Sequence, residues 1–314
     1  MRSGSIHLFR FSGIDVFLHW SWFLVAVYEI QTRAGNYSSV IWNVVEYLAL
    51  FLIVTTHEFG HALACRQVGG RANRIVLWPL GGVAYVDPPP RPGATLWSIA
   101  AGPLVNVALL PILWIGVRGA RVSGMPATNH DLFLLLQAVF YINFGLFLFN
   151  ILPVYPLDGG QILRSLLWFV LGRARSLMVA TVLGLLGVAA FIGFALWVKD
   201  LWLGALAVFM LMNCWAGLKH AQDLLRLSKV PRRHGYGCPT CQTSPPIGAY
   251  WRCGNCGAPF DTFVTGGVCP MCTTRFPTTQ CLDCGRQFPL NEWVAPTLVA
   301  PGSPRPADSS LRSQ

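Results

Sequence analysis

Long apolar stretches separated by short polar segments fill the first two thirds of the chain. A helix needs about 20 apolar residues to cross a hydrocarbon core of about 30 Å. Six stretches satisfy this requirement, namely residues 14–31, 45–66, 95–117, 131–153, 177–198 and 201–218. The pattern therefore predicts an all-α polytopic membrane protein with about six transmembrane helices. The first stretch has no small-residue cleavage site after it, so we expect a retained span rather than a signal peptide.

One apolar segment, residues 73–87, is too short to cross a membrane as a helix. Pro79, Gly81 and Gly82 separate two short runs that are rich in β-formers, which is the pattern of a hairpin. A strand edge is not tolerated against lipid, because its backbone groups would lack hydrogen-bond partners. We therefore expect a re-entrant β-hairpin-like segment that lies against protein or lines a cavity.

The composition also indicates a membrane protein. Hydrophobic residues make up 54% of the chain and charged residues 11%, whereas soluble domains carry about 25% charged residues. The net charge is +10. With the amino terminus inside, the inner segments contain fourteen Lys and Arg residues and the outer segments four. This excess predicts a multi-pass protein of the cytoplasmic membrane with both termini in the cytoplasm.

The second predicted span contains the sequence HEFGH at residues 57–61. His57 and His61 are four residues apart, so both imidazoles lie on one face of a helix and can bind one Zn²⁺. Glu58 can then take a proton from a metal-bound water. Ionisable groups are costly at membrane depth, and their presence there indicates a functional site. The combination predicts a protease that cuts inside the membrane.

A catalytic zinc ion usually has three protein ligands. Asp158 is the candidate for the third, because the six-span topology places it on the same membrane side as the two histidines. Its carboxylate could also cap the helix that follows. Asn106 and Asn150 are amides at membrane depth, and either could bind substrate backbone or hydrogen-bond between helices.

These motifs resemble those of the site-2 protease family of intramembrane zinc metalloproteases, particularly its compact six-span bacterial members. The resemblance covers about residues 14–218 and consists of four motifs, which are HEFGH, PLGG, AGPLVN and NILPVYPLDGG. It implies regulated intramembrane proteolysis of a single-span membrane protein in the lipid bilayer.

The resemblance also implies roles for individual residues. His57, His61 and Asp158 would bind zinc, and Glu58 would be the catalytic base. The PLGG segment, which contains Gly81 and Gly82, would help to present the substrate.

The last third of the chain is rich in cysteine. Eight of the ten cysteines form four C-x-x-C pairs, which are Cys238 and Cys241, Cys253 and Cys256, Cys269 and Cys272, and Cys281 and Cys284. This spacing predicts two structural zinc ribbons in a reducing compartment. We expect successive pairs to share an ion, and nested pairing is the alternative. The other two cysteines, Cys65 and Cys214, are expected to be packing residues.

These features predict four parts of the chain. They are a membrane-embedded metalloprotease domain (1–218), a linker helix (219–237), the two zinc ribbons (238–290) and a disordered tail (291–314). We expect the ribbons to bind a protein partner. Arginines in this region also permit contact with nucleic acid or acidic lipid, although no decisive nucleic-acid motif is present.

Two other functions fit parts of the pattern. A catalytically inactive zinc-ribbon membrane adaptor would have no chemical need for Glu58, which is intact. A metal transporter would need several ionisable residues along a path across the bilayer, and the predicted spans offer one cluster.

Overall fold

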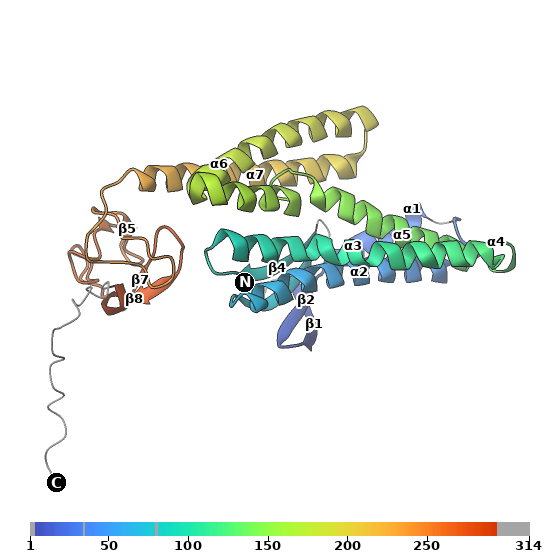
Figure 1. Ribbon diagram of the computed structural model, residues 1–314, viewed down its shortest axis with the longest axis horizontal. Coiled ribbons are helices and arrows are strands. Elements are labelled where there is room, and N and C mark those ends of the chain that lie inside the picture. Colours follow the sequence, from blue (N-terminus) through green and yellow to red (C-terminus); the bar gives the residue numbers. More distant parts are fainter. Residues whose placement is uncertain (1–3, 34, 79–80, 294–314) are drawn as a thin grey trace, which may run out of the picture. The chain divides into compact units, whose positions relative to one another are not determined.

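The computed structural model describes residues 4–33, 35–78 and 81–293 (Figure 1). The chain divides into two compact units, Met1–Leu225 and Arg226–Gln314, which are described separately. Most of the tail expected to be disordered, from residue 294 onward, lies outside the described residues.

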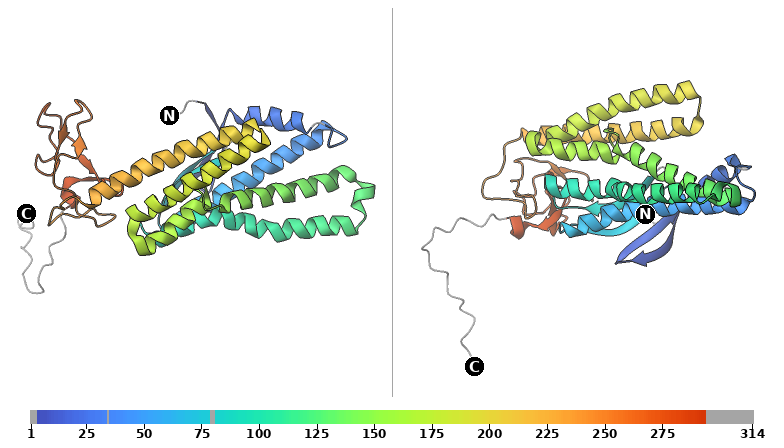
Figure 2. Two further views of the ribbon diagram at one scale, coloured as in Figure 1. Left: turned by 90° about the horizontal axis from the view of Figure 1, so that it is seen from above. Right: turned by 45° about the vertical axis from the view of Figure 1, so that its right-hand side comes forward.

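Within the described residues, the protein has five helices that are long and apolar enough to cross a membrane. They are α2 (Val40–Gln67), α3 (Pro92–Val122), α5 (His130–Ile151), α6 (Asp158–Val198) and α7 (Leu201–Ser228). The single-turn α4 (Met125–Thr128) connects α3 to α5, and α2, α3 and α5 pack against one another (Figure 2). Apolar side chains such as Leu186 and Leu196 are 65% and 72% exposed, as expected for helices that face lipid.

The predicted first span, residues 14–31, is not a spanning helix. It consists of strand β2 (Ile14–His19) followed by α1 (Trp22–Thr32), whose 11 residues extend only about 16 Å. Apolar periodicity does not separate a buried strand from a buried helix, and β2 is hydrogen-bonded to a strand on each side. The described residues therefore contain five candidate helical spans rather than six.

The segment nevertheless runs antiparallel to most of α2. Val16 packs in one cluster with Ala62 and Cys65, near the end of α2, whereas Arg33 forms an ion pair with Glu46 near its start. From Glu46 to Cys65 the helix rises about 28 Å. The chain thus covers nearly the thickness of a bilayer core here, partly as strand and partly as a short helix.

A four-stranded sheet packs on α2. Its order is β1 (Ser5–Phe11), β2, β3 (Arg71–Trp78) and β4 (Gly81–Asp87), with β2 and β3 parallel and the other neighbours antiparallel. Strands β3 and β4 form the hairpin expected near residues 73–87, and its re-entrant position stays a prediction. The sheet itself, to which β1 and β2 contribute, was not predicted.

Helix α6 consists of two pieces. Gly172 has φ 76° and ψ 169°, a conformation that favours glycine, and it separates residues 158–171 from residues 173–198. The chain turns back at this point (Figure 1). The second piece contains the span predicted at 177–198, and Lys199 and Asp200 join it to α7.

The second unit contains two small antiparallel hairpins. One pairs β5 (Trp251–Arg252) with β6 (Pro259–Phe260), and the other pairs β7 (Thr278–Gln280) with β8 (Gln287–Pro289). The 3₁₀ helix η1 (Leu290–Trp293) follows and buries Trp293 beside Cys238 and Cys281.

Candidate metal centres

Three side chains from two helices converge on one point in the first unit. His57 and His61 come from α2, and Asp158 begins α6. The Nε2 atoms of the two histidines are 3.1 Å apart, and Asp158 Oδ2 lies 3.1 Å from that of His57 and 3.2 Å from that of His61. Both histidines are buried.

This triangle fits a zinc ion. Bonds of about 2.0–2.1 Å in a tetrahedral arrangement place neighbouring ligand atoms about 3.3 Å apart. The three observed distances fall just below this value. Three protein ligands leave the fourth position for water or substrate, as in catalytic rather than structural zinc sites.

Hydrogen bonds fix the tautomer of His57. The Asn143 Nδ2 group donates to the Asn106 carbonyl, so Asn143 Oδ1 is the atom that accepts from Asn106 Nδ2. The remaining amide atom, Asn106 Oδ1, lies 2.6 Å from His57 Nδ1 and must accept its proton. The Nε2 lone pair of His57 is therefore free for the ion. Both asparagines are completely buried.

His61 is oriented in the same way by α3. Its Nδ1–H donates to the Ser98 carbonyl at 2.9 Å, which leaves Nε2 as the ligand atom. A residue with a side chain at Gly102 would interfere with both histidines, because a Cβ there would lie 2.3 Å from His61 Nε2 and 2.8 Å from His57 Nε2. Gly102 was not predicted as a site residue, although it lies within the AGPLVN motif.

Asp158 reaches the histidines because the start of α6 packs closely on the preceding loop. A Cβ on Gly159 would lie 2.2 Å from the Ile151 carbonyl oxygen, and one on Gly160 would lie 2.4 Å from the Tyr155 nitrogen. The two glycines thus permit the approach. The carboxylate contacts the histidines, and the side chain of the preceding N-cap residue, Leu157, makes no capping bond.

Glu58 is buried beside the three candidate ligands and is hydrogen-bonded to the sheet. Its Oε2 accepts from the Ala84 N–H of β4 at 3.0 Å. β4 is an outer strand of the sheet, and residues of an antiparallel pair alternate between bonding across the pair and pointing outward. The N–H of Ala84 therefore points away from β3, and the outer edge of β4 faces Glu58.

The remaining predicted site residues lie on α5 and β4. Asn150 is in the last turn of α5, and no described residue hydrogen-bonds its side chain. Gly81 and Gly82 begin β4, opposite Trp78 and Leu77. The other half of the PLGG motif lies outside the described residues.

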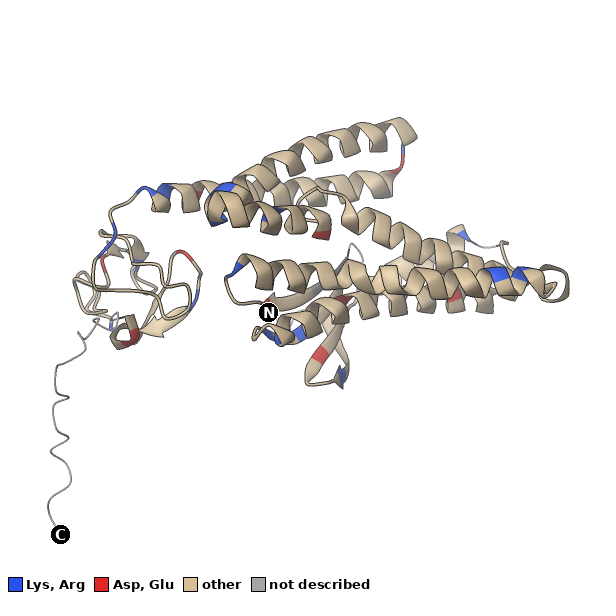
Figure 3. Cartoon of the chain, in the orientation of Figure 1, with Lys and Arg blue, Asp and Glu red and all other residues tan. Residues whose placement is uncertain are grey.

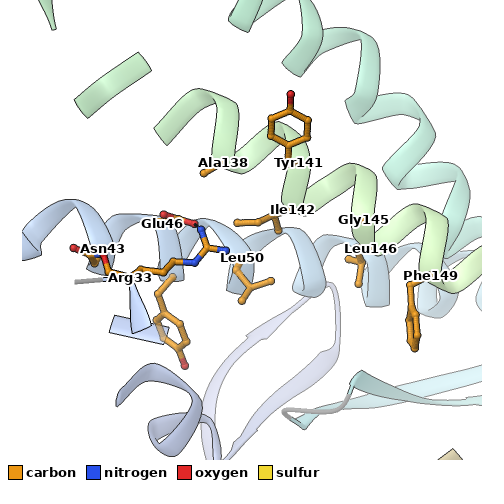
Figure 4. A pocket seen from close by; sticks show the side chains of 11 residues that line it. Arg33, Asn43, Glu46, Leu50, Ala138, Tyr141, Ile142, Gly145, Leu146 and Phe149 are labelled. Atoms are coloured by element: carbon orange, nitrogen blue, oxygen red, sulfur yellow. Dashed lines mark hydrogen bonds and ion pairs between the residues drawn. The ribbon is translucent and has the colours of Figure 1, made fainter. Parts of the chain in front are cut away.

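A cavity of about 650 Å³ lies between α2 and α5 (Figure 4). On α2 it is lined by Asn43, Glu46, Tyr47 and Leu50, at spacings of three and four residues that continue to His57. Ile142, Gly145 and other α5 residues form the opposite wall, and the Arg33–Glu46 ion pair forms one end. The cavity thus shares a face of α2 with the metal ligands and ends about two turns from them.

The cysteines form two further candidate metal centres in the second unit. One contains Cys238, Cys241, Cys281 and Cys284, and the other contains Cys253, Cys256, Cys269 and Cys272. In each group the sulfur atoms lie within 4.8 Å of one another, which suits a tetrahedral ion with four thiolates. The pairing is therefore nested, and the expected pairing of successive motifs is wrong. The centre formed by the first and last motifs joins the two ends of the unit. The spacing of the motifs does not specify that these two motifs meet.

Neighbouring cysteines affect one another's ionisation. A hydrogen bond with Cys281 lowers the pKa of Cys241 to about 4, and the same contact raises the pKa of Cys281. Hydrogen bonds with Thr274 lower the pKa of Cys272 to about 6. Each group therefore holds a readily formed thiolate, which is the form that binds metal.

Two arginines of this unit are engaged in ion pairs. Arg232 contacts Asp283 at 2.6 Å, and Arg233 contacts Asp261 at 2.7 Å. These ion pairs connect segments of the second unit. The paired carboxylates offset the charge of the two arginines, so they contribute less to a basic surface than the sequence implied.

Comparison with known proteins places these motifs in a family. The sequence model of Peptidase family M50 matches residues 45–123 and 120–194. Zinc metalloprotease MJ0392 of Methanocaldococcus jannaschii is 35% identical over 57% of this chain and 50% of its own length. Putative zinc metalloprotease Rip3 of Mycobacterium tuberculosis is 32% identical over 66% of this chain and 56% of its own.

Among solved structures, the Site-2 Protease from Methanocaldococcus jannaschii aligns with 26% identity and a TM-score of 0.49, over 68% of this chain and 95% of that one. The chain spans about half the length of the curated relatives it matches. The family match includes His57, His61 and Asp158, so the part of the chain that holds this metal centre matches peptidase family M50, the site-2 protease family.

Proposed function

We propose that this protein is an intramembrane zinc endopeptidase that cleaves transmembrane segments of single-span membrane proteins. The observation that supports it most is the set of three mutual distances of 3.1–3.2 Å between the ligand atoms of His57, His61 and Asp158. His57 and His61 lie on α2, which is long enough to cross a bilayer, and Glu58 lies beside them.

Glu58 is the proposed proton carrier. When bound, zinc would polarise the scissile carbonyl and make its water more acidic. Glu58 would accept the proton of the attacking water and later donate it to the leaving amine nitrogen. Asn106 and the Ser98 carbonyl would hold the two imidazoles in the orientation that the ligands need.

The open edge of β4 supports a route for the substrate backbone. A peptide bond in a helix is shielded by its own hydrogen bonds, so a transmembrane segment must unwind before it is cut. An unwound segment that added to β4 would gain main-chain hydrogen bonds and lie next to Glu58. Gly81 and Gly82 at the start of β4 would permit close approach. The amide of Asn150, which no described residue hydrogen-bonds, would bind the substrate backbone.

The cavity between α2 and α5 supports a route for the uncleaved part of the segment. Its apolar walls suit a transmembrane segment, and its axis leads along α2 toward His57. We propose that the segment lies here on its way to the metal centre.

The basic residues support an orientation. Arg66 lies in the last turn of α2, Arg173 begins the second piece of α6, and Lys219 follows the apolar part of α7. The positive-inside rule therefore favours these ends, and the metal centre near them, in the cytoplasm. Residues 14–33 run along α2 in the opposite direction. Both termini would therefore lie on the cytoplasmic side of the cell membrane.

The zinc ribbons would form a separate structural module. Both candidate centres have four thiolates and no open position, which suits structural rather than catalytic zinc. Val264 and Met271 are 71% and 76% exposed, and such apolar side chains favour docking of a protein partner.

The test is a Glu58→Gln variant co-expressed with a candidate single-span substrate. We expect zinc content at the wild-type level and cleavage reduced by at least about a hundredfold, because the proton carrier is lost while the ligands remain. Cleavage at the wild-type rate would refute the assignment. An inactive adaptor would show no cleavage with either form, and a transporter would show zinc flux instead.

A further inference from the structure

Three basic side chains gather where α6 turns back beside α7. They are Arg164 on the first piece of α6, Arg173 at the start of the second piece, and His220 on α7. Each arginine is close enough to act on the charge of His220, and Arg173 also acts on Arg164. Figure 3 shows Lys and Arg on α6 and α7 near this turn.

Packing of the helices holds these groups together. Leu177 of the second piece forms a buried cluster with Ala221 and Leu224 of α7, and Ala174 packs against it. Arg173 and His220 are the neighbours of Ala174 and Ala221 in the chain, so this contact brings them to one place. The positive φ of Gly172 returns the chain so that Arg164 lies near them.

Arg164 has no counterion in the part of the chain that the structure describes. Its Nε atom is buried and has no hydrogen-bond partner. The titratable groups near it are Tyr155, Arg173 and His220, none of which is a carboxylate. Asp223 acts on His220, not on Arg164. A partly buried cation among like charges is unfavourable unless an anion joins it.

The position of the cluster identifies the anion. Arg173 begins a candidate span, and Lys219 and Arg175 extend the basic surface at the same helix ends. In the proposed orientation this is the cytoplasmic interface, where anionic phospholipids supply phosphate groups and basic pockets between helices bind them.

We infer that Arg164, Arg173 and His220 form a binding site for the phosphate group of an anionic phospholipid. The site is distinct from the metal centre, although Arg164 lies less than two turns after Asp158 on the same helical piece. A bound lipid would therefore also hold the piece that carries the third zinc ligand.

The experiment measures lipid binding to the full-length protein by native mass spectrometry in detergent. Phosphatidylglycerol is the probe, phosphatidylcholine is the zwitterionic control, and inorganic phosphate tests a free anion. We expect phosphatidylglycerol to bind wild type more tightly than phosphatidylcholine. Arg164→Gln should weaken phosphatidylglycerol binding about tenfold, a loss of about 1.4 kcal/mol, because a direct charge-assisted hydrogen bond to the phosphate is removed.

Arg175→Gln is the matched control, because Arg175 is exposed and lies on the same helix end. It should change phosphatidylglycerol binding by less than about twofold, and Arg164→Lys should restore part of the lost affinity. The inference is overturned if wild type and Arg164→Gln bind phosphatidylglycerol equally, or if inorganic phosphate alone displaces it at equal concentration. Binding is read without any substrate, so the result does not depend on the proposed proteolysis.

Discussion

At the residue scale, the metal centre depends on groups that never touch the ion. His57 and His61 can act as ligands only if their Nδ1 atoms are satisfied elsewhere, by Asn106 and by the Ser98 carbonyl. Space is a second requirement, and Gly102 provides it.

Replacing Gly102 by alanine should empty the catalytic site. The added methyl group would overlap the imidazole of His61, and α3 cannot move away without losing the Ser98 contact. The described residues contain three candidate zinc sites, so we expect bound zinc to fall from three equivalents to two, measured by plasma mass spectrometry. Gly116→Ala in the same helix, where a Cβ would meet no atom within 4 Å, is the control. Three equivalents in Gly102→Ala would contradict the prediction.

Replacing Asn143 by leucine should weaken zinc binding without removing a ligand. The change deletes the partners that fix the Asn106 amide, so its oxygen is no longer held toward His57 Nδ1. Loss of such an outer partner typically costs about 10- to 100-fold in metal affinity. Competition with a chromophoric zinc chelator measures the affinity of the most weakly bound zinc ion, which is where we expect this change. An unchanged affinity would show that packing alone orients His57.

The sequence was sufficient to predict that His57, His61 and Asp158 come together, but not which residues orient them. HEFGH fixes the spacing of His57 and His61 within one helix, and the predicted topology placed Asp158 on the same membrane side. The roles of Asn143 and Gly102 depend on which faces of α3 and α5 meet α2. Spacing within a helix contains no information about that contact.

At the element scale, residues 14–31 show how an apolar run can mislead. A strand whose two faces are both covered carries apolar side chains on both, as does a helix surrounded by lipid. In β2, Ile14 and Val16 are buried and Phe17 and Leu18 are partly buried. The hairpin of β3 and β4 was predictable because glycine and proline interrupt it. β2 has no such interruption before α1, and its partner β3 lies more than fifty residues further along the chain.

The cavity between α2 and α5 makes a prediction at the same scale. A Cβ on Gly145 would meet no atom within 4 Å, so leucine there should fill the cavity without disturbing the helices. If the substrate segment lies in the cavity, Gly145→Leu should lower the cleavage rate about tenfold, a loss of about 1.4 kcal/mol, and leave zinc content unchanged. Gly116→Leu, a matched change at an open position on α3, should cleave normally. Equal rates for the two variants would exclude this route.

At the scale of the whole molecule, a membrane unit and a cysteine-rich unit differ in what holds them together. The first buries clusters of apolar side chains between helices and sheet, such as Ile14, Val54 and Leu77. The second has hairpins of two or three residues per strand, and such a small unit gains much of its folding energy from metal. Its topology therefore depends on which cysteines share an ion.

Two double substitutions distinguish the nested pairing from the successive one. In the nested arrangement Cys238 and Cys284 share a centre, so replacing both by serine should remove one zinc equivalent. Cys238 and Cys253 belong to different centres, so replacing these two should remove two equivalents. Successive pairing predicts the opposite result for each variant, because it puts Cys238 with Cys253 and separates Cys284. Both variants lose two thiolates and keep the catalytic ligands, so each controls for the other. A C-x-x-C motif bends the chain in the same way whichever second motif shares its ion. The zinc contents of the two variants therefore report which motifs share an ion, and so how the two ends of the unit are joined.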